Sequence, residues 1–132
     1  MNKTMMALAC VCALFALAGC RGTAPVYNVA TKTVSACNAQ ALEKAILAGG
    51  TERGWSMEKI QPGLIQGTLW RRGHQAVVSI PYTADTYSIR YKSSSELKYN
   101  AKKDKIHPQY NNWINYLDHS IMKALGEQAC AE

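Results

Sequence analysis

The feature that most constrains the fold is a change in the spacing of apolar residues along the chain. From Trp55 to Lys92, apolar and polar side chains alternate. This period of two is typical of β-strands that bury one face and expose the other. The predicted strands cover residues 55–60, 64–72, 74–82 and 87–92, with turns at Pro62-Gly63, at Gly73 and at residues 83–85. Such short connections indicate antiparallel neighbours in a meander.

Helical spacing precedes the strands. Over residues 37–47, apolar side chains recur at threes and fours, which predicts a helix with one buried face. Ser35 or Asn38 is the expected N-cap, because a short polar side chain accepts a hydrogen bond from a free backbone amide. The pair Gly49-Gly50 is the expected end of this helix.

Helical spacing also follows the strands, from Pro108 to Gly126. Proline is favourable at the first position of a helix, and glycine is common directly after the last. The expected buried face consists of Tyr110, Trp113, Ile114, Leu117, Ile121 and Leu125. Two further segments, residues 26–29 and 31–34, favour extended structure.

Together these segments predict an α+β fold with an antiparallel meander of about four strands and two helices packed on one face. Residues 26–132 are enough for one compact domain. If Ala76, Val78 and Ile80 face the helices, the opposite side of the sheet should carry Trp70, Val77, Arg90 and Lys92, together with Arg72. The alternative is that Trp70 belongs to the core.

The N-terminus has the character of an export signal rather than of a domain. Lys3 is followed by an uncharged run from Met5 to Leu17 and then by the small residues Ala18 and Gly19. As a helix, this run reaches roughly 20 Å, which is short of the ~30 Å hydrocarbon core of a bilayer. We therefore do not expect a permanent transmembrane helix.

The stretch Leu17-Ala18-Gly19-Cys20 resembles the lipobox of bacterial lipoproteins. The resemblance implies that the sulfur of Cys20 accepts a diacylglycerol and that residues 1–19 are a signal peptide, cleaved before Cys20. Residues 20–25 would then be a lipidated tether. Arg21, rather than an aspartate, implies delivery to the outer membrane of a Gram-negative cell, facing the periplasm. The alternative is a signal or buried helix with an incidental cysteine.

Cys10 and Cys12 would leave with the signal peptide and Cys20 is assigned to the lipid, so Cys37 and Cys130 remain as a pair in an oxidising compartment. We predict that they form a disulfide, which requires both helices on the same side of the sheet. The alternative is two buried free thiols. The segments "KIHPQYNNWINYLDHSI" and "SSSELKYN" resemble passages of small proteobacterial lipoproteins of unknown function, which implies only a shared envelope domain.

No convincing catalytic motif is found in the sequence. His74, His107 and His119 lack the spacing of metal ligands, and we expect His74 and His107 to be exposed residues at element boundaries. Short S-x-x-K patterns lack the further motifs that accompany them in serine enzymes. They occur at Ser56 to Lys59, Ser95 to Lys98 and Ser120 to Lys123. We therefore expect a non-enzymatic protein without cofactor or metal; a hydrolase assembled only in three dimensions is a weaker alternative.

The charge balance indicates the kind of partner. The chain has 15 Lys and Arg against 9 Asp and Glu, which favours anionic neighbours. Nucleic acid would be attracted equally, but an envelope-anchored protein rarely meets it. We therefore expect a binding module for an envelope protein or an anionic polymer, acting through Trp70, Arg72, Arg90 and Lys92 or through the lysine-rich segment 93–105. The alternative is an immunity or inhibitor lipoprotein that blocks a periplasmic toxic enzyme.

Overall fold

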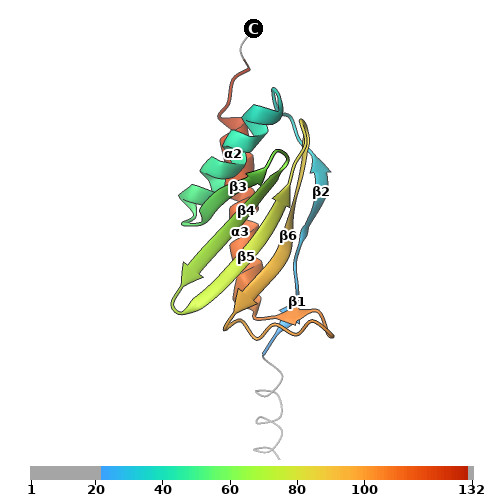
Figure 1. Ribbon diagram of the computed structural model, residues 1–132, viewed down its shortest axis with the longest axis vertical. Coiled ribbons are helices and arrows are strands. Elements are labelled where there is room, and N and C mark those ends of the chain that lie inside the picture. The colour runs from blue at the N-terminus through green and yellow to red at the C-terminus, as the bar shows by residue number, and fades with distance from the viewer. Residues whose placement is uncertain (1–21, 131–132) are drawn as a thin grey trace, which may run out of the picture.

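The computed structural model describes residues 22–130 (Figure 1), so Cys20 and the expected signal peptide lie outside the described residues. The elements, in chain order, are β1 (Ala24–Pro25), β2 (Val29–Thr33), α2 (Ala39–Glu52), β3 (Ser56–Gln61), β4 (Leu64–Arg71), β5 (His74–Pro81), β6 (Thr86–Ser95), β7 (Lys105–Ile106) and α3 (Pro108–Gly126). They form an α+β fold, as the sequence predicts.

The main sheet has five antiparallel strands in the order β2-β6-β5-β4-β3. Strands β3 to β6 are the predicted meander, and β2 adds a fifth strand beside β6. Helix α2 connects β2 at one edge of the sheet to β3 at the other. Strands β1 and β7 form a separate two-stranded sheet at one end of the molecule (Figure 1).

The core lies between the sheet and the two helices. Alternate residues of β5, namely Ala76, Val78 and Ile80, are fully buried, as predicted. The apolar stripe of α3 is buried with them and includes Tyr110, Ile114, Leu117 and Ile121. Figure 1 shows α3 running behind the sheet, while no described helix covers the front.

The predicted end of the first helix is wrong, because α2 continues through Gly49 and Gly50 to Glu52. Both glycines are buried at close contacts. A β-carbon on Gly49 would lie 2.6 Å from the backbone nitrogen of Ile121 in α3, and one on Gly50 would lie 2.3 Å from the sulfur of Met57 in β3. These glycines therefore permit close packing inside a helix rather than end it.

Side chains cap both helices at the N-terminus. Asn38, one of the two residues expected in this role, accepts a hydrogen bond from the backbone nitrogen of Ala41 at 2.8 Å. His107 does the same for α3 and accepts from the backbone nitrogen of Gln109 at 3.1 Å. Helix α3 begins at Pro108 and ends at Gly126, as predicted.

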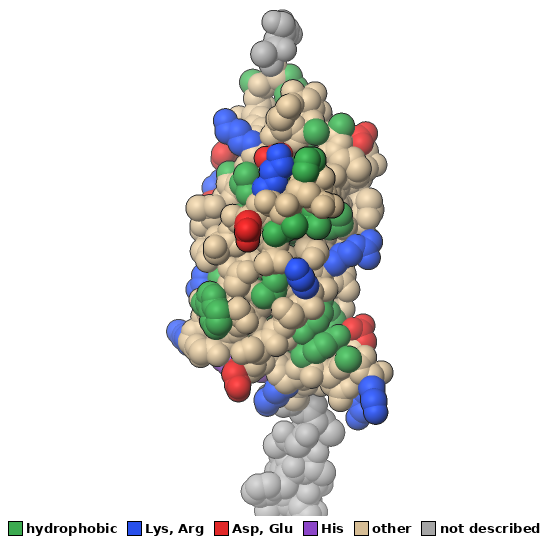
Figure 2. Space-filling view, viewed as in Figure 1, with side chains coloured by type: hydrophobic (Ala, Val, Ile, Leu, Met, Phe, Trp, Pro, Cys, Tyr) green, Lys and Arg blue, Asp and Glu red, His purple; other side chains and the backbone are tan. Residues whose placement is uncertain are grey.

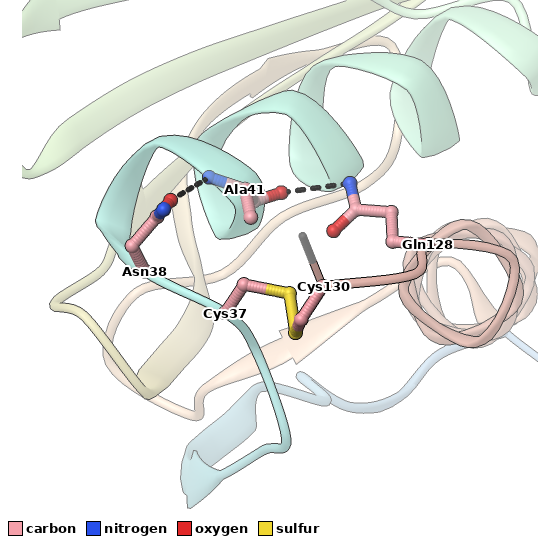
Figure 3. Close-up of a disulfide and its surroundings, with 5 residues drawn as sticks. All are labelled: Cys37, Asn38, Ala41, Gln128 and Cys130. Carbon is pink, nitrogen blue, oxygen red and sulfur yellow. Dashed lines mark hydrogen bonds between the residues drawn. A yellow bond between two sulfur atoms is a disulfide. The ribbon is translucent and has the colours of Figure 1, made fainter. Parts of the chain in front are cut away.

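A disulfide joins Cys37 and Cys130, as predicted, with their Cα atoms 5.4 Å apart (Figure 3). It connects the residue before the cap of α2 to the segment after α3. Beside it, the side-chain amide of Gln128 donates to the backbone oxygen of Ala41 at 2.9 Å. One covalent bond and one hydrogen bond therefore hold the start of α2 and the segment after α3 together.

The end of the expected tether is ordered in a strand. Ala24 pairs with Ile106, and Pro25 pairs with Lys105, so these two residues form β1 rather than a free linker. The side-chain amide of Asn111 donates to the carbonyl of Pro25 at 2.9 Å. The chain is thus fixed to the body of the protein four residues after Cys20.

Candidate functional site

The predicted binding face is only partly assembled in the structure. Trp70 is 66% exposed on the side of the sheet away from the helices, so it does not belong to the core. Arg90 pairs with Ser79 on the same side, and the Lys92 ammonium donates to the Gln66 side chain at 2.5 Å. However, Gln66 lies four residues from Trp70 along β4, a distance of about 13 Å. The tryptophan and the two cations are therefore separate.

The remaining member of that predicted face lies elsewhere. Arg72 occupies the two-residue turn between β4 and β5, with φ of 51°, and Gly73 follows with φ of 80°. Positive φ at both positions is typical of the tight hairpin turns that match the twist of antiparallel strands. The turn places Arg72 outside the alternation of the strands, and its side chain lines a hollow beside α3.

This hollow and another one lie side by side between the end of the sheet and α3. We call the two hollows the arginine groove. The first has a volume of about 200 Å³ and is lined by Arg53, Trp55, Leu69, Arg71, Gln109, Trp113 and Tyr116. The second has a volume of about 390 Å³ and is lined by Arg71, Arg72, His74, Leu97, His107, Gln109 and Trp113. Because they share Arg71, Gln109 and Trp113, one ligand could contact both.

Three elements bring the arginines of the groove together. Arg53 is the C-cap residue of α2, Arg71 is the last residue of β4, and Arg72 is the first residue of the turn. The guanidinium of Arg71 donates to the backbone oxygen of Arg53 at 3.3 Å. Arg53 thus lies beside Arg71 and Arg72, although it is far from them in the sequence.

The charges of these arginines are not neutralised by neighbouring carboxylates. The ion pairs within residues 22–130 are Lys32–Asp118, Lys59–Glu43 and Lys123–Glu52, and none of them includes an arginine. Arg53 instead donates from Nε to the Ser120 hydroxyl at 2.8 Å, and its guanidinium lies 5.1 Å from the centre of the Tyr116 ring. The groove therefore presents uncompensated positive charge beside aromatic surface.

Both histidines lie at element boundaries, as expected, since His74 begins β5 and His107 caps α3. They are half-buried rather than exposed, and they line the groove. His74 Nδ1 lies 2.7 Å from the backbone oxygen of Glu96, so it must donate, which leaves Nε2 as an acceptor in the neutral ring. His107 Nδ1 accepts from Gln109 and therefore carries its proton on Nε2. The two rings thus offer the groove one acceptor and one donor.

The groove is lined by arginine, histidine, glutamine, leucine and aromatic side chains. No serine, aspartate or glutamate is among its lining residues. In the S-x-x-K pattern on α3, the buried Ser120 hydroxyl accepts from Arg53, while Lys123 pairs with Glu52 at 3.1 Å. Across residues 22–130, no three His, Cys, Asp or Glu side chains are grouped closely enough to hold a metal ion.

Sequence reasoning missed Arg53, Arg71 and Tyr116 as members of a site. Arg71 carried a usable signal, since alternation along β4 places it on the side opposite Trp70, where the helices pack. Arg53 and Tyr116 carried none, because their proximity arises from the packing of α2 against α3.

Neither described helix has both the length and the apolar character needed to cross a bilayer. In comparisons with known proteins, no family model matches this chain, and no curated protein or solved structure matches it.

Proposed function

We propose that this protein is a lipid-anchored, non-enzymatic module of the bacterial cell envelope that binds an anionic polymer in the arginine groove. The lipid would be attached to Cys20, as the lipobox resemblance implies. The domain would face the periplasm from the outer membrane. The groove takes the role first assigned to the sheet face, because it gathers cations and aromatic surface that the sheet face keeps apart.

The observation that carries this proposal is the absence of a carboxylate partner for Arg53, Arg71 and Arg72 within residues 22–130. Guanidinium groups form strong paired hydrogen bonds with carboxylates and phosphates. The guanidinium groups of Arg53 and Arg71 are already held by hydrogen bonds, so these two side chains lose little conformational freedom when an anion binds.

A polymer fits the shape of the groove. The two hollows share a wall at Arg71 and Trp113, so a chain of linked units would pass from one to the other. The second hollow, at about 390 Å³, has the size of a small ligand pocket, for which roughly 300 to 1,000 Å³ is usual, and the first adds about 200 Å³ beside it. Tyr116 is 49% exposed and offers a ring face at one end of this path.

The direct test measures binding of defined polymers to the full-length, membrane-extracted protein in a neutral detergent. Polygalacturonate supplies carboxylates, polyphosphate supplies phosphates, and dextran is the uncharged control. We expect both anionic polymers, but not dextran, to bind, and the binding to weaken with added salt. The affinities for the two anions will show which acidic group the groove prefers.

Two variants and one matched control locate the site. Arg71→Ala and Arg72→Asn should each lower the affinity about tenfold, since a charge-assisted hydrogen bond contributes about 1.5–3 kcal/mol. Asparagine tolerates positive φ, so Arg72→Asn removes the charge and keeps the turn. Arg90→Gln removes the same charge from the far side of the sheet and should leave the affinity nearly unchanged. Equal losses in all three variants would contradict a site in the groove.

A further inference from the structure

The segment that runs from the end of β6 to the first residue of β7 is rich in positive charge. Residues 96–105, which we call the basic loop, contain Lys98, Lys102, Lys103 and Lys105 against Glu96 and Asp104. None of these lysines belongs to an ion pair in the part of the chain that the structure describes. Lys98, Lys102 and Lys103 are exposed, and Lys105 is half-buried.

The basic loop is held in one conformation. Asn100 and Lys105 exchange two backbone hydrogen bonds, at 2.8 and 3.2 Å, and the Asn100 side chain accepts from the backbone nitrogen of Lys103 at 3.1 Å. Leu97 is only 2% exposed and anchors the start of the loop in the core. The lysines are therefore displayed by a defined structure rather than by a free linker.

The basic loop lies directly beside the start of the described chain. Pro25 pairs with Lys105, and the backbone nitrogen of Val26 donates to the oxygen of Asp104 at 3.0 Å. Ala24, the first residue of β1, comes four residues after Cys20, so the two Cα atoms are at most about 14 Å apart. This limit is less than twice the Debye length of about 8–10 Å at physiological salt, so charges within this reach are attracted to the surface although screening weakens the attraction.

We propose that the basic loop rests on anionic phospholipid headgroups of the membrane to which Cys20 is anchored. This inference depends on the lipid anchor in the proposed function but not on the groove. A lipid on Cys20 brings β1 to the membrane surface, and β1 brings the basic loop with it. Lysines at such a surface are attracted to its negative potential. Tyr27 and Tyr99, each 40% exposed beside these elements, suit the headgroup region.

The contact would fix how the domain stands on the membrane. The segment after α3 leaves the end of the molecule opposite to β1 and β7 (Figure 1). Lys and Arg side chains are spread over the face in Figure 2, and some of them lie at the end where β1 and β7 are. The basic loop adjoins the arginine groove through the hydrogen bond between His74 and the oxygen of Glu96. The groove would therefore be held at the membrane end, and the disulfide at the distal end.

The test uses the full-length lipidated protein in vesicles of phosphatidylcholine, with and without phosphatidylglycerol. A polarity-sensitive dye on Ala101→Cys reports on the basic loop, and the same dye on Lys44→Cys reports on the exposed surface of α2 near the disulfide. Nitroxide-labelled headgroups quench a dye that touches the surface. We expect phosphatidylglycerol to raise quenching at Ala101 at least about twofold and to leave quenching at Lys44 unchanged.

A charge variant separates lipid contact from mere proximity. Replacing all four lysines of the basic loop by glutamine should remove the effect of phosphatidylglycerol, while the lipid still retains the protein on the vesicles. If the protein is retained but quenching at Ala101 does not respond to phosphatidylglycerol, the proposed contact is wrong and the anchor stands. If Cys20 carries no lipid and the protein leaves the vesicles, the anchor and this inference both fail, while the groove remains testable with soluble polymers.

Discussion

At the scale of single residues, two buried tyrosines differ in what their hydroxyl groups meet. Tyr87 donates to the carboxylate of Asp118, which also accepts from Lys32 at 2.8 Å. The hydroxyl of Tyr110 is buried with no hydrogen-bond partner among the described residues. Both side chains are fully buried, so the two tyrosines differ in whether the hydroxyl group has a hydrogen-bond partner.

Removing these two hydroxyls should therefore change stability in opposite directions. Tyr110→Phe deletes an unpaired polar group and should leave the free energy of unfolding unchanged or raise it by up to about 1 kcal/mol. Tyr87→Phe removes the donor to Oδ1 of Asp118, which keeps only its contact with Lys32, and should lower that free energy by about 1–3 kcal/mol. Urea unfolding of both variants measures the effects. Equal destabilisation would show that the hydroxyl of Tyr110 has a partner in solution.

The same tyrosines predict how stability responds to alkaline pH. Burial, with the contact to Asp118, raises the pKa of Tyr87, and burial raises the pKa of Tyr110. Above pH ~10 the unfolded chain loses these protons while the folded protein keeps them. The unfolding free energy should therefore be unaffected by them below pH ~10 and fall as the pH rises further. In Tyr110→Phe the fall should be less steep, by up to about 1.4 kcal/mol per pH unit.

At the scale of elements, the contact between α2 and α3 depends on a missing side chain at Gly49. A β-carbon there would lie 2.6 Å from the nitrogen and 2.7 Å from the Cα of Ile121, and neither backbone atom can move without shifting α3. Gly49→Ala should lower the free energy of unfolding by about 1–3 kcal/mol. Gly126→Ala is the matched control, since nothing lies within 4 Å of its added carbon.

In that control, helix propensity alone acts, so Gly126→Ala should be neutral or stabilising by up to about 1 kcal/mol. Thermal unfolding followed by circular dichroism compares the two variants. A Gly49→Ala variant as stable as Gly126→Ala would mean that the helices separate at no cost, and the close approach would then have no structural importance.

The same glycine shows what sequence reasoning could and could not foresee. Periodicity predicted four strands of the meander and the helix from Pro108, because local burial patterns follow strand and helix geometry directly. The end of α2 could not be read in this way, since a glycine pair is equally compatible with a helix end and with close helix packing. Only the position of Ile121, far along the chain, distinguishes the two.

The arginine groove could not be predicted from the sequence for a related reason. Its residues come from α2, β4, the following turn and α3, so no local pattern unites them. The predicted disulfide could be recognised because only two cysteines remained after the lipobox was assigned, a matter of counting rather than of geometry. Alternation allowed Trp70 to lie on the open face but left a core position open as the alternative. Its distance from Arg90 and Lys92 depends on strand register, which alternation does not give.

At the scale of the whole molecule, the disulfide closes a loop that contains the core of the fold. Cys37 and Cys130 are 93 residues apart, and both helices and strands β3 to β6 lie between them. Closing a loop of this length restricts the unfolded chain and stabilises the folded state by about 4–5 kcal/mol in the chain-entropy model.

Reduction should therefore lower the free energy of unfolding by several kcal/mol while leaving the folded contacts in place. The paired variant Cys37→Ala with Cys130→Ala should have nearly the stability of the reduced protein and should not respond to a reductant. Urea unfolding of both proteins, with and without dithiothreitol, makes the comparison. If the wild-type protein is equally stable in both conditions, the unfolded chain must keep its two ends close together without the disulfide. The hydrogen bond from Gln128 to Ala41 in the folded protein cannot explain such a result, because a single hydrogen bond contributes too little.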